Sequence, residues 1–260
     1  MSNGTQQILG TVTDGNWVAA LEADLAIYAT TNPSPLRGTN TIIFDSGSDG
    51  AASPGGAGWG KVVVSPAGMA SLTGTLPDNT AVAPSAAGVS KYGEWPLYLP
   101  LYGAGTYGSL SGWVVFTNLP GESLEGNAAW FRTNSSGKLY PHGFTNNVSM
   151  TGSTFTPGRA KTNVLGLTNF LVTLSGGNLL VPLTNDAMLS PGGKFVTNGS
   201  GISKLTLSVV TNTGIISGSF LDPATGLATP ISGVVLQEQT NAAGFFLSTN
   251  ATGLFELVLP

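Results

Sequence analysis

Apolar and small polar residues alternate along most of the chain, and this two-residue period constrains the fold more than any other feature. Leu72-Thr-Gly-Thr-Leu76 and Ile216-Ser-Gly-Ser-Phe220 each place apolar side chains on one face and polar ones on the other. Such runs are typical of half-buried antiparallel strands. Turns that end in glycine, such as Pro66-Ala-Gly68 and Asn212-Thr-Gly214, separate the runs and suit short hairpins. The pattern predicts an all-β protein with roughly fifteen strands.

The segment between Val18 and Tyr28 contains residues that favour a helix, but its pattern alternates. Glu22, Asp24 and their apolar neighbours follow a two-residue period, which favours a strand. Asp14-Gly15 comes just before this segment and is a signal for a tight hairpin turn. We therefore expect a hairpin in the first 28 residues, with a helix as the alternative for its second arm.

Two parts of the chain resemble each other. The run from Lys61 to Asp78 contains an apolar strand, a glycine turn, an alternating strand and an aspartate, and the run from Lys204 to Asp222 has the same order. Thr39–Gly47 likewise matches Thr168–Gly176. These matches predict two antiparallel β-meander repeats, residues 1–157 with an N-terminal hairpin and residues 158–260.

A meander leaves two free sheet edges, which natural proteins close or cover. We expect each repeat to form a β-barrel-like unit; stacked β-sandwiches or one large closed sheet are the alternatives. Large alternating side chains are expected to fill the barrels instead of an apolar ligand. Trp113 and Trp130 are expected among them, because the second repeat has Phe245, Phe246 and Phe255 at comparable positions.

Composition indicates where such a protein works. Charged residues make up only 8% of the chain, against about 25% in an average soluble protein, and hydrophobic residues make up 41%. The surface is then solvated by Ser, Thr, Asn and backbone amides, which is common in secreted bacterial β-proteins and predicts an extracellular or cell-surface location. The absence of cysteine excludes disulfides and zinc–thiolate sites. The first residues, Met1-Ser-Asn-Gly, lack the basic and apolar segments of a signal peptide.

Charge and missing motifs disfavour several functions. The formal net charge is −4 and the nine Lys and Arg residues are scattered, so nucleic acid is not an expected partner. No run of about 18 apolar residues predicts a transmembrane helix. His142 is the only histidine and no Gly-x-Ser-x-Gly motif accompanies it, so neither a Ser-His-Asp triad nor a transition-metal site is expected. No cofactor is predicted.

A set of motifs runs along nearly the whole chain: Asp14-Gly-Asn-Trp17, Glu94-Trp-Pro-Leu-Tyr98, Leu110-Ser-Gly-Trp113, Tyr140-Pro-His-Gly-Phe144 and Ala243-Gly-Phe-Phe-Leu-Ser-Thr-Asn250. In this order they resemble an uncharacterised repeat-rich β-domain found in large secreted proteins of environmental bacteria. The resemblance implies an exported protein carried beside other extracellular modules, with no assigned chemistry and no catalytic residues to transfer. It also implies that the strands near 8–28 end a preceding unit of a longer chain.

Aromatic residues are concentrated in the first repeat, and exposed rings of this kind favour binding surfaces. Trp95, Tyr98 and Tyr102 are the candidate ligand-binding residues. Pro96 and Pro100 interrupt regular strand pairing, so this run is expected at a sheet edge. Planar rings at an edge can stack on the apolar faces of sugars.

Acidic residues near the aromatic run are the candidate catalytic groups, because glycoside hydrolysis uses a pair of carboxyl groups. Glu94 lies next to Trp95, and burial against an aromatic ring can make a carboxyl a general acid. Glu122 and Glu125 are the candidates for the second acid. The loop Asp45-Ser-Gly-Ser-Asp49 offers oxygen ligands for calcium, although it has fewer ligands than an EF-hand.

Together these features predict a non-catalytic extracellular module with a structural role or with affinity for polysaccharide. An uncharged polar surface suits neutral glycans, which are bound by hydroxyl–amide hydrogen bonds and ring stacking. The alternative is a glycan-active hydrolase that uses Glu94 with Glu122 or Glu125. Two acids across a groove lined by tryptophan would favour the enzyme, and a buried Trp95 without a groove would favour a structural role.

Overall fold

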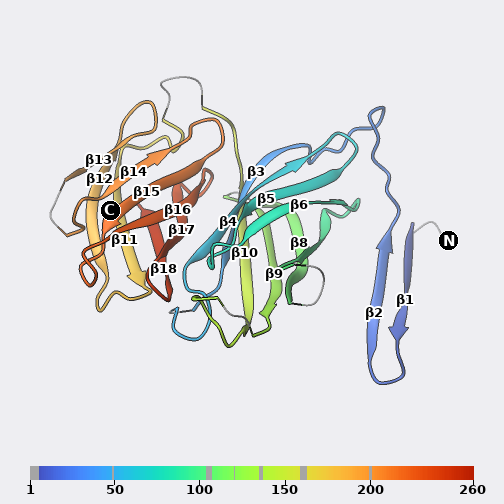
Figure 1. The fold of residues 1–260 in the computed structure, drawn as a ribbon. Helices are drawn as coiled ribbons and strands as arrows, with labels where there is room; N and C mark the ends of the chain where they lie inside the picture. Colours follow the sequence, from blue (N-terminus) through green and yellow to red (C-terminus); the bar gives the residue numbers. More distant parts are fainter. Residues whose placement is uncertain are drawn as a thin grey trace.

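The computed structural model describes residues 6–48, 50–103, 107–119, 121–134, 137–158, 163–198 and 201–260. All regular secondary structure in these residues is β-strand, which confirms the all-β prediction. None of the described segments forms a helix long and apolar enough to cross a membrane. The strands form a two-stranded hairpin followed by two eight-stranded sheets (Figure 1).

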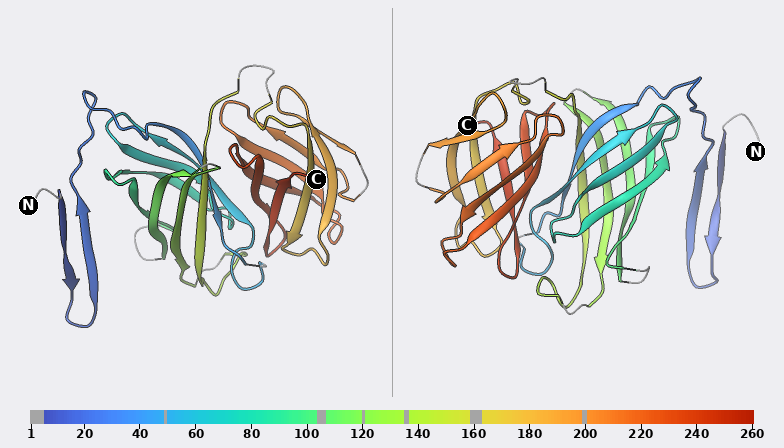
Figure 2. Two further views of the ribbon diagram at one scale, coloured as in Figure 1. Left: turned by 180° about the vertical axis from the view of Figure 1, so that it is seen from behind. Right: turned by 45° about the horizontal axis from the view of Figure 1, so that its top comes forward.

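The hairpin consists of β1 (Gln7–Thr13) and β2 (Val18–Asp24), so the strand predicted after Val18 is confirmed. Asp14 Oδ1 accepts hydrogen bonds from the backbone N–H groups of Asn16 and Trp17, at 2.9 and 3.1 Å. These bonds, the one from Asn16 foremost, hold the pKa of Asp14 below its usual value because they favour the carboxylate. The hairpin stands at one side of the two large sheets (Figure 2).

The first large sheet is an up-and-down meander in which sequential strands pair antiparallel, except for β6 and β7 at its two ends. Its strands are β3 (Gly38–Asp45), β4 (Ala57–Val64), β5 (Met69–Thr75), β6 (Ala81–Gly88), β7 (Glu94–Pro100), β8 (Gly108–Leu119), β9 (Glu122–Arg132) and β10 (Phe144–Thr154). β3 also pairs with β10. The seam between β6 and β7 is joined by a tight turn in which the Ser90 N–H donates to the Glu94 carbonyl. The sheet is therefore a nearly closed barrel.

The second sheet repeats this architecture. Its strands are β11 (Asn169–Gly176), β12 (Leu183–Leu189), β13 (Phe195–Asn198), β14 (Thr206–Val209), β15 (Ile215–Leu221), β16 (Ala228–Leu236), β17 (Asn241–Leu247) and β18 (Thr252–Val258). β11 pairs with β18, and the seam between β13 and β14 is joined by the Lys194–Ser208 bridge. The two barrel-like units predicted from the sequence are confirmed (Figure 2).

Inward-facing side chains fill both barrels. The large, fully buried residues of the first barrel include Phe44, Leu72, Leu76, Trp95 and Trp130. Those of the second barrel include Phe170, Phe220, Phe246 and Phe255. Trp130 thus lies in the core as expected, and the described inner side chains pack against one another.

Glycines in the middle of the strands let neighbouring backbones bend and approach. Gly60 faces Gly74 across β4 and β5, and the same arrangement recurs in β16 and β17. A Cβ added at Gly112 would lie 2.0 Å from the Asn127 carbonyl oxygen. Strands that coil into a small barrel need such positions, because a side chain there would push the partner strand away.

The two long sequence matches behave differently in the structure. Thr39–Gly47 and Thr168–Gly176 both include the first strand of a barrel, so this match is structural. Lys61–Asp78 covers the second half of the second strand and all of the third strand of the first barrel, whereas Lys204–Asp222 contains the fourth and fifth strands of the second. The runs Lys61–Asp78 and Lys204–Asp222 therefore do not occupy equivalent positions in the two barrels, contrary to the expectation. Similar hairpins recur around both barrels, so a local match need not mark equal positions.

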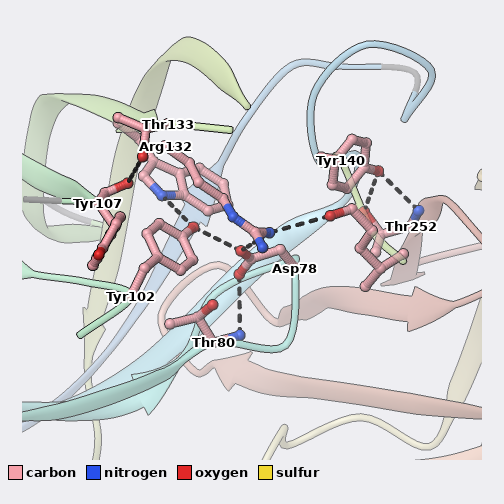
Figure 3. Close-up of polar contacts among 10 residues, drawn as sticks. Asp78, Thr80, Tyr102, Tyr107, Arg132, Thr133, Tyr140 and Thr252 are labelled. Atoms are coloured by element: carbon pink, nitrogen blue, oxygen red, sulfur yellow. Dashed lines mark hydrogen bonds and ion pairs between the residues drawn. The ribbon is translucent and has the colours of Figure 1, made fainter. Parts of the chain in front are cut away.

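Polar contacts join the two barrels. The Tyr140 hydroxyl donates to the Gly50 carbonyl and accepts from the Thr252 N–H, both at 3.0 Å (Figure 3). Elsewhere between the two barrels, Trp59 Nε1 donates a hydrogen bond to Ser232 Oγ at 2.7 Å. These groups come from the first barrel and from β16 and β18 of the second. The first barrel ends with β10 at Thr154, and the second begins with β11 at Asn169.

Candidate functional site

Trp95 lies inside the first barrel. Its side chain is 1% exposed, and its ring packs against that of Phe116 with the ring centres 6.5 Å apart. β7 is an end strand of the sheet order, as Pro96 and Pro100 predicted. Trp95 alternates with these prolines, so it points inward while they point outward. The expectation of an exposed Trp95 is therefore wrong, and its ring is not accessible to a ligand.

Tyr102 belongs to a buried polar network at one end of the first barrel (Figure 3). Its hydroxyl donates to Asp78 Oδ2 at 2.6 Å and accepts from Trp130 Nε1 at 3.1 Å. Arg132 places Nη1 3.7 Å from Asp78 Oδ2 and its guanidinium 4.7 Å from the centre of the Tyr102 ring. Burial, and then the Asp78 carboxylate, raise the pKa of Tyr102 far above its usual value. The Tyr102 hydroxyl is engaged within the protein, so it is not a free ligand-binding group.

We expect Tyr102→Phe to destabilise the first barrel by ~1–3 kcal/mol, because two buried polar groups lose their shared partner. The effect depends on pH. Since folding raises the pKa of Tyr102, its stabilising contribution is complete below the unfolded value of about 10 and is lost progressively as the pH rises above it. Urea denaturation at pH 7 and pH 11 measures both effects. The wild type should lose more stability at high pH than the variant, and equal losses would count against this assignment.

Three aromatic side chains are exposed together on the outer face of β7–β9. Tyr98, Trp113 and Phe131 are 58%, 46% and 41% exposed, and they come from β7, β8 and β9 in turn. Trp113 pairs with Pro96, two residues from Tyr98, so the two rings are diagonal neighbours. Trp113 was expected in the core, but Val114 beside it is buried and alternate residues face opposite sides. We call Tyr98, Trp113 and Phe131 the aromatic face.

Uncharged polar residues lie between and beside these rings. Ser111 lies opposite Tyr98, and Asn127 pairs with Trp113 on one side and with Ser149 of β10 on the other. An open hollow of about 630 Å³ lies here, lined by Trp113, Asn127 and Ser149 and, at its end, by Glu125. The face therefore combines flat apolar rings with amide and hydroxyl groups.

Glu94 and Glu125 lie at one end of the same face. Both pair with Val115, so β8 separates them and their α-carbons are about 10 Å apart, two strand spacings. Ser90 Oγ donates to Glu94 Oε2 at 3.4 Å. Glu122 begins β9, and its side chain lies outside the described part of the structure. The pairing of Glu94 with Glu122 is thus untested.

The hairpin brings two further acids to Glu94. Carboxylate oxygens of Glu22, Asp24 and Glu94 lie within 4.8 Å of one another. With Pro96 and Trp113 they line a hollow of about 370 Å³ between the hairpin and the barrel wall. A pair of nearby carboxyl groups suits glycoside hydrolysis. The sequence marks Glu22 and Asp24 as a local carboxylate pair on one strand face, but it did not place them beside Glu94, because no local pattern shows that β2 returns to β7.

The predicted calcium loop is only partly described. Asp45 Oδ1 accepts a hydrogen bond from the Gly47 N–H at 2.9 Å. Asp49 lies outside the described residues, so the calcium site remains a prediction. Glu256 of β18 lies nearby, and burial, then the charge of Asp45, raise the pKa of Glu256. His142 is exposed in a turn.

Comparison with known proteins adds little to this geometry. No protein-family model matches the chain, and no curated protein does. Among solved structures, the chain is similar to the endo-1,5-α-L-arabinanase from Thermotoga petrophila RKU-1 in complex with TRIS, with a TM-score of 0.28 and 9% identity. The match covers 97% of this chain and 66% of that chain. A likeness at this TM-score carries no conclusion about fold or activity.

Proposed function

We propose that this protein is a non-catalytic extracellular module that binds neutral polysaccharide through the aromatic face. The observation that carries the proposal is the exposure of Tyr98, Trp113 and Phe131 on three adjacent strands of one outer wall. Rigid aromatic side chains supply a large contact area at low entropic cost. A chain that lies across the wall can stack on successive rings.

The polar groups of the face fit an uncharged ligand. Ser111 and Asn127 lie beside the rings, and Ser149 continues the polar surface onto β10. Amides and hydroxyls can donate to and accept from sugar hydroxyls. The low content of charged residues, 8%, agrees with a neutral partner and not with an ionic one.

The proposal is tested by measuring retention of the protein on a panel of neutral plant and algal polysaccharides. Trp113→Ala should weaken binding by about tenfold or more, since stacked aromatics at a binding surface contribute more than 1 kcal/mol. Trp17→Ala is the matched control, because Trp17 is 50% exposed but lies on the hairpin turn. Equal retention of wild type and Trp113→Ala would contradict the proposal, and so would a Trp17→Ala effect of the same size.

A glycan-active hydrolase is the second candidate, and the acids around Glu94 favour it. Glu22, Asp24 and Glu94 converge beside Trp113 in the hollow between hairpin and barrel. An enzyme of this kind would release new reducing ends from the bound polysaccharide, and Glu94→Gln would abolish their release. Retention without new reducing ends supports the binding module instead.

A further inference from the structure

The two ends of the first barrel differ. The network of Tyr102, Asp78 and Arg132 lies at one end (Figure 3). At the opposite end, where β3 and β9 begin and β8 and β10 end, there is an open cavity of about 470 Å³. This volume lies within the range of roughly 300–1,000 Å³ that is usual for small-molecule sites. We call it the mouth cavity, and its lining includes Leu36, Arg37, Asn40, Phe116, Ser123 and Glu238.

Asn40 lines the mouth cavity from the inner side of the barrel. It precedes Ile42 and Phe44 on β3 at intervals of two residues, so its side chain points inward as theirs do. Asn40 is only 5% exposed. In the described part of the structure, its side-chain amide has no hydrogen-bond partner. A buried amide without a partner lowers stability, so this group is one that a ligand can satisfy.

A buried asparagine in the second barrel shows the contrast. Asn185 of β12 is also 5% exposed, and it faces inward with Ala187 and Leu189. Its Oδ1 accepts from the Ile202 N–H at 3.0 Å, and its Nδ2 donates to the Ile202 carbonyl at 3.4 Å. A loop of the protein therefore satisfies Asn185, whereas Asn40 faces a cavity.

Two opposite charges stand at the mouth cavity. Glu238 comes from the turn after β16 of the second barrel, and its Oε2 accepts from Ser123 Oγ at 2.5 Å and from the Thr154 N–H at 3.3 Å. Arg37 precedes β3, and its Nη1 donates to the Ser34 carbonyl at 3.5 Å. Arg37 forms no ion pair within the described residues, so most of its donors are available to a ligand.

These groups define the chemistry of the ligand. A guanidinium donates, a carboxylate accepts and an amide does both, so adjacent hydroxyls, which also do both, can bond to all three. A ligand with a single charge is attracted by one of Arg37 and Glu238 and repelled by the other. Phe116 and Leu36, which pack with the core, add an apolar wall for the C–H face of a ring.

We infer that the mouth cavity is a second binding site and that it takes one neutral pyranose ring, with Asn40 and Arg37 bonding to its hydroxyls. The ring is either a free monosaccharide or the terminal residue of a glycan chain. Trp113 of the aromatic face is not part of the described lining of the cavity, so this site is separate from the one proposed above.

The test is a nitrogen–proton NMR titration of the full chain with glucose, galactose, mannose and xylose. The side-chain NH₂ signals of Asn40, identified by their absence in Asn40→Leu, should shift with a Kd of about 1 mM or tighter for at least one sugar. Those of Asn185 should stay in place. Asn40→Leu should abolish this binding without lowering the Tm, because it removes an amide that has no partner in the free protein.

A second variant keeps the test independent of the core. Arg37 is exposed, and Arg37→Met should weaken sugar binding by about tenfold or more, since it removes hydrogen bonds from a charged donor. Lys138→Met, which removes another exposed cation, should leave binding unchanged. Equal affinities of Arg37→Met and the wild type would overturn the inference. The absence of an Asn40 shift with every sugar would do so too, as would a shift with glycine alone, which would indicate a zwitterionic ligand.

The source of the ring is decided with the tetrasaccharide of the sugar that binds. Equal affinity for the tetrasaccharide and the monosaccharide supports a chain end, and binding of the monosaccharide alone supports a free sugar. Trp113→Ala separates this site from the aromatic face. It should leave the Asn40 shift intact even where polysaccharide retention is lost, so either site can fail without the other.

Discussion

Gly112→Ala should destabilise the first barrel by about 3 kcal/mol, one of the two largest effects expected from a single substitution in this protein. The added Cβ would lie 2.0 Å from the Asn127 carbonyl oxygen and 2.6 Å from the Ala128 α-carbon. Both atoms belong to the backbone of β9, so no side-chain rotation can relieve the overlap. β8 and β9 must separate, which weakens the ladder between them and the core beneath it.

Hydrogen exchange of the two barrels locates this effect. Gly112→Ala should speed exchange in the first barrel, and Gly244→Ala, whose Cβ would lie 2.1 Å from the Ser232 carbonyl oxygen, should do so in the second. Gly88→Ala is the control, because its nearest neighbour would be Met69 Sδ at 4.0 Å. A Gly112→Ala protein as stable as Gly88→Ala would show that the strands do not approach as closely as described.

Arg132→Leu should cost about 3 kcal/mol or more, because it leaves a buried carboxylate without its countercharge. The Asp78 side chain is 1% exposed, and Arg132 Nη1 lies 3.7 Å from its Oδ2. The Tyr102 hydroxyl and the Thr80 N–H still donate to Asp78, at 2.6 and 3.0 Å, so part of the carboxylate's stabilisation remains. Urea denaturation of the full chain measures the loss.

A double substitution separates the charge effect from lost packing. Arg132→Leu combined with Asp78→Asn should be more stable than Arg132→Leu alone, because the buried charge is gone. Lys138→Leu, an exposed cation in the same segment, should change stability by less than about 0.5 kcal/mol. A double variant less stable than Arg132→Leu would mean that the Asp78 charge is not what the arginine balances.

The local pattern was sufficient to predict the fold class. Alternation places Leu72 and Phe220 inside and identifies their strands, and Asp14-Gly15 identifies the first hairpin. Pro96 and Pro100 correctly marked β7 as an end strand. These features depend on the chemistry of a few neighbouring residues, which a sequence displays directly.

The site depends on which side of a strand each residue faces, and there the sequence was ambiguous. Trp95 was expected to be exposed and Trp113 to be buried, but Trp95 lies in the core and Trp113 is exposed. Each strand has apolar residues on both faces, so alternation alone did not determine which face is inside. Residues two apart on a strand face the same side of the sheet. Since Leu97 and Leu99 are both buried, Trp95 on the same strand would be placed inside by this rule.

Contacts between strands that are distant in the sequence could not be predicted for a different reason. The convergence of Glu22 and Asp24 on Glu94 depends on how residues 25–37 direct the hairpin along the barrel wall. The Asp78–Arg132 pair joins a loop after β5 to the end of β9. No short-range pattern encodes either approach.

The most direct test of the aromatic face is the indole N–H region of the nitrogen–proton NMR spectrum, recorded as a retained polysaccharide oligomer is added. The chain has five tryptophans, and only Trp113 lies on the aromatic face. The account predicts that the Trp113 signal shifts in proportion to bound glycan, while the signals of buried Trp95 and Trp130 and of Trp17 on the hairpin stay in place. Glycan binding that shifts the Trp17 signal and leaves that of Trp113 unchanged would contradict the account.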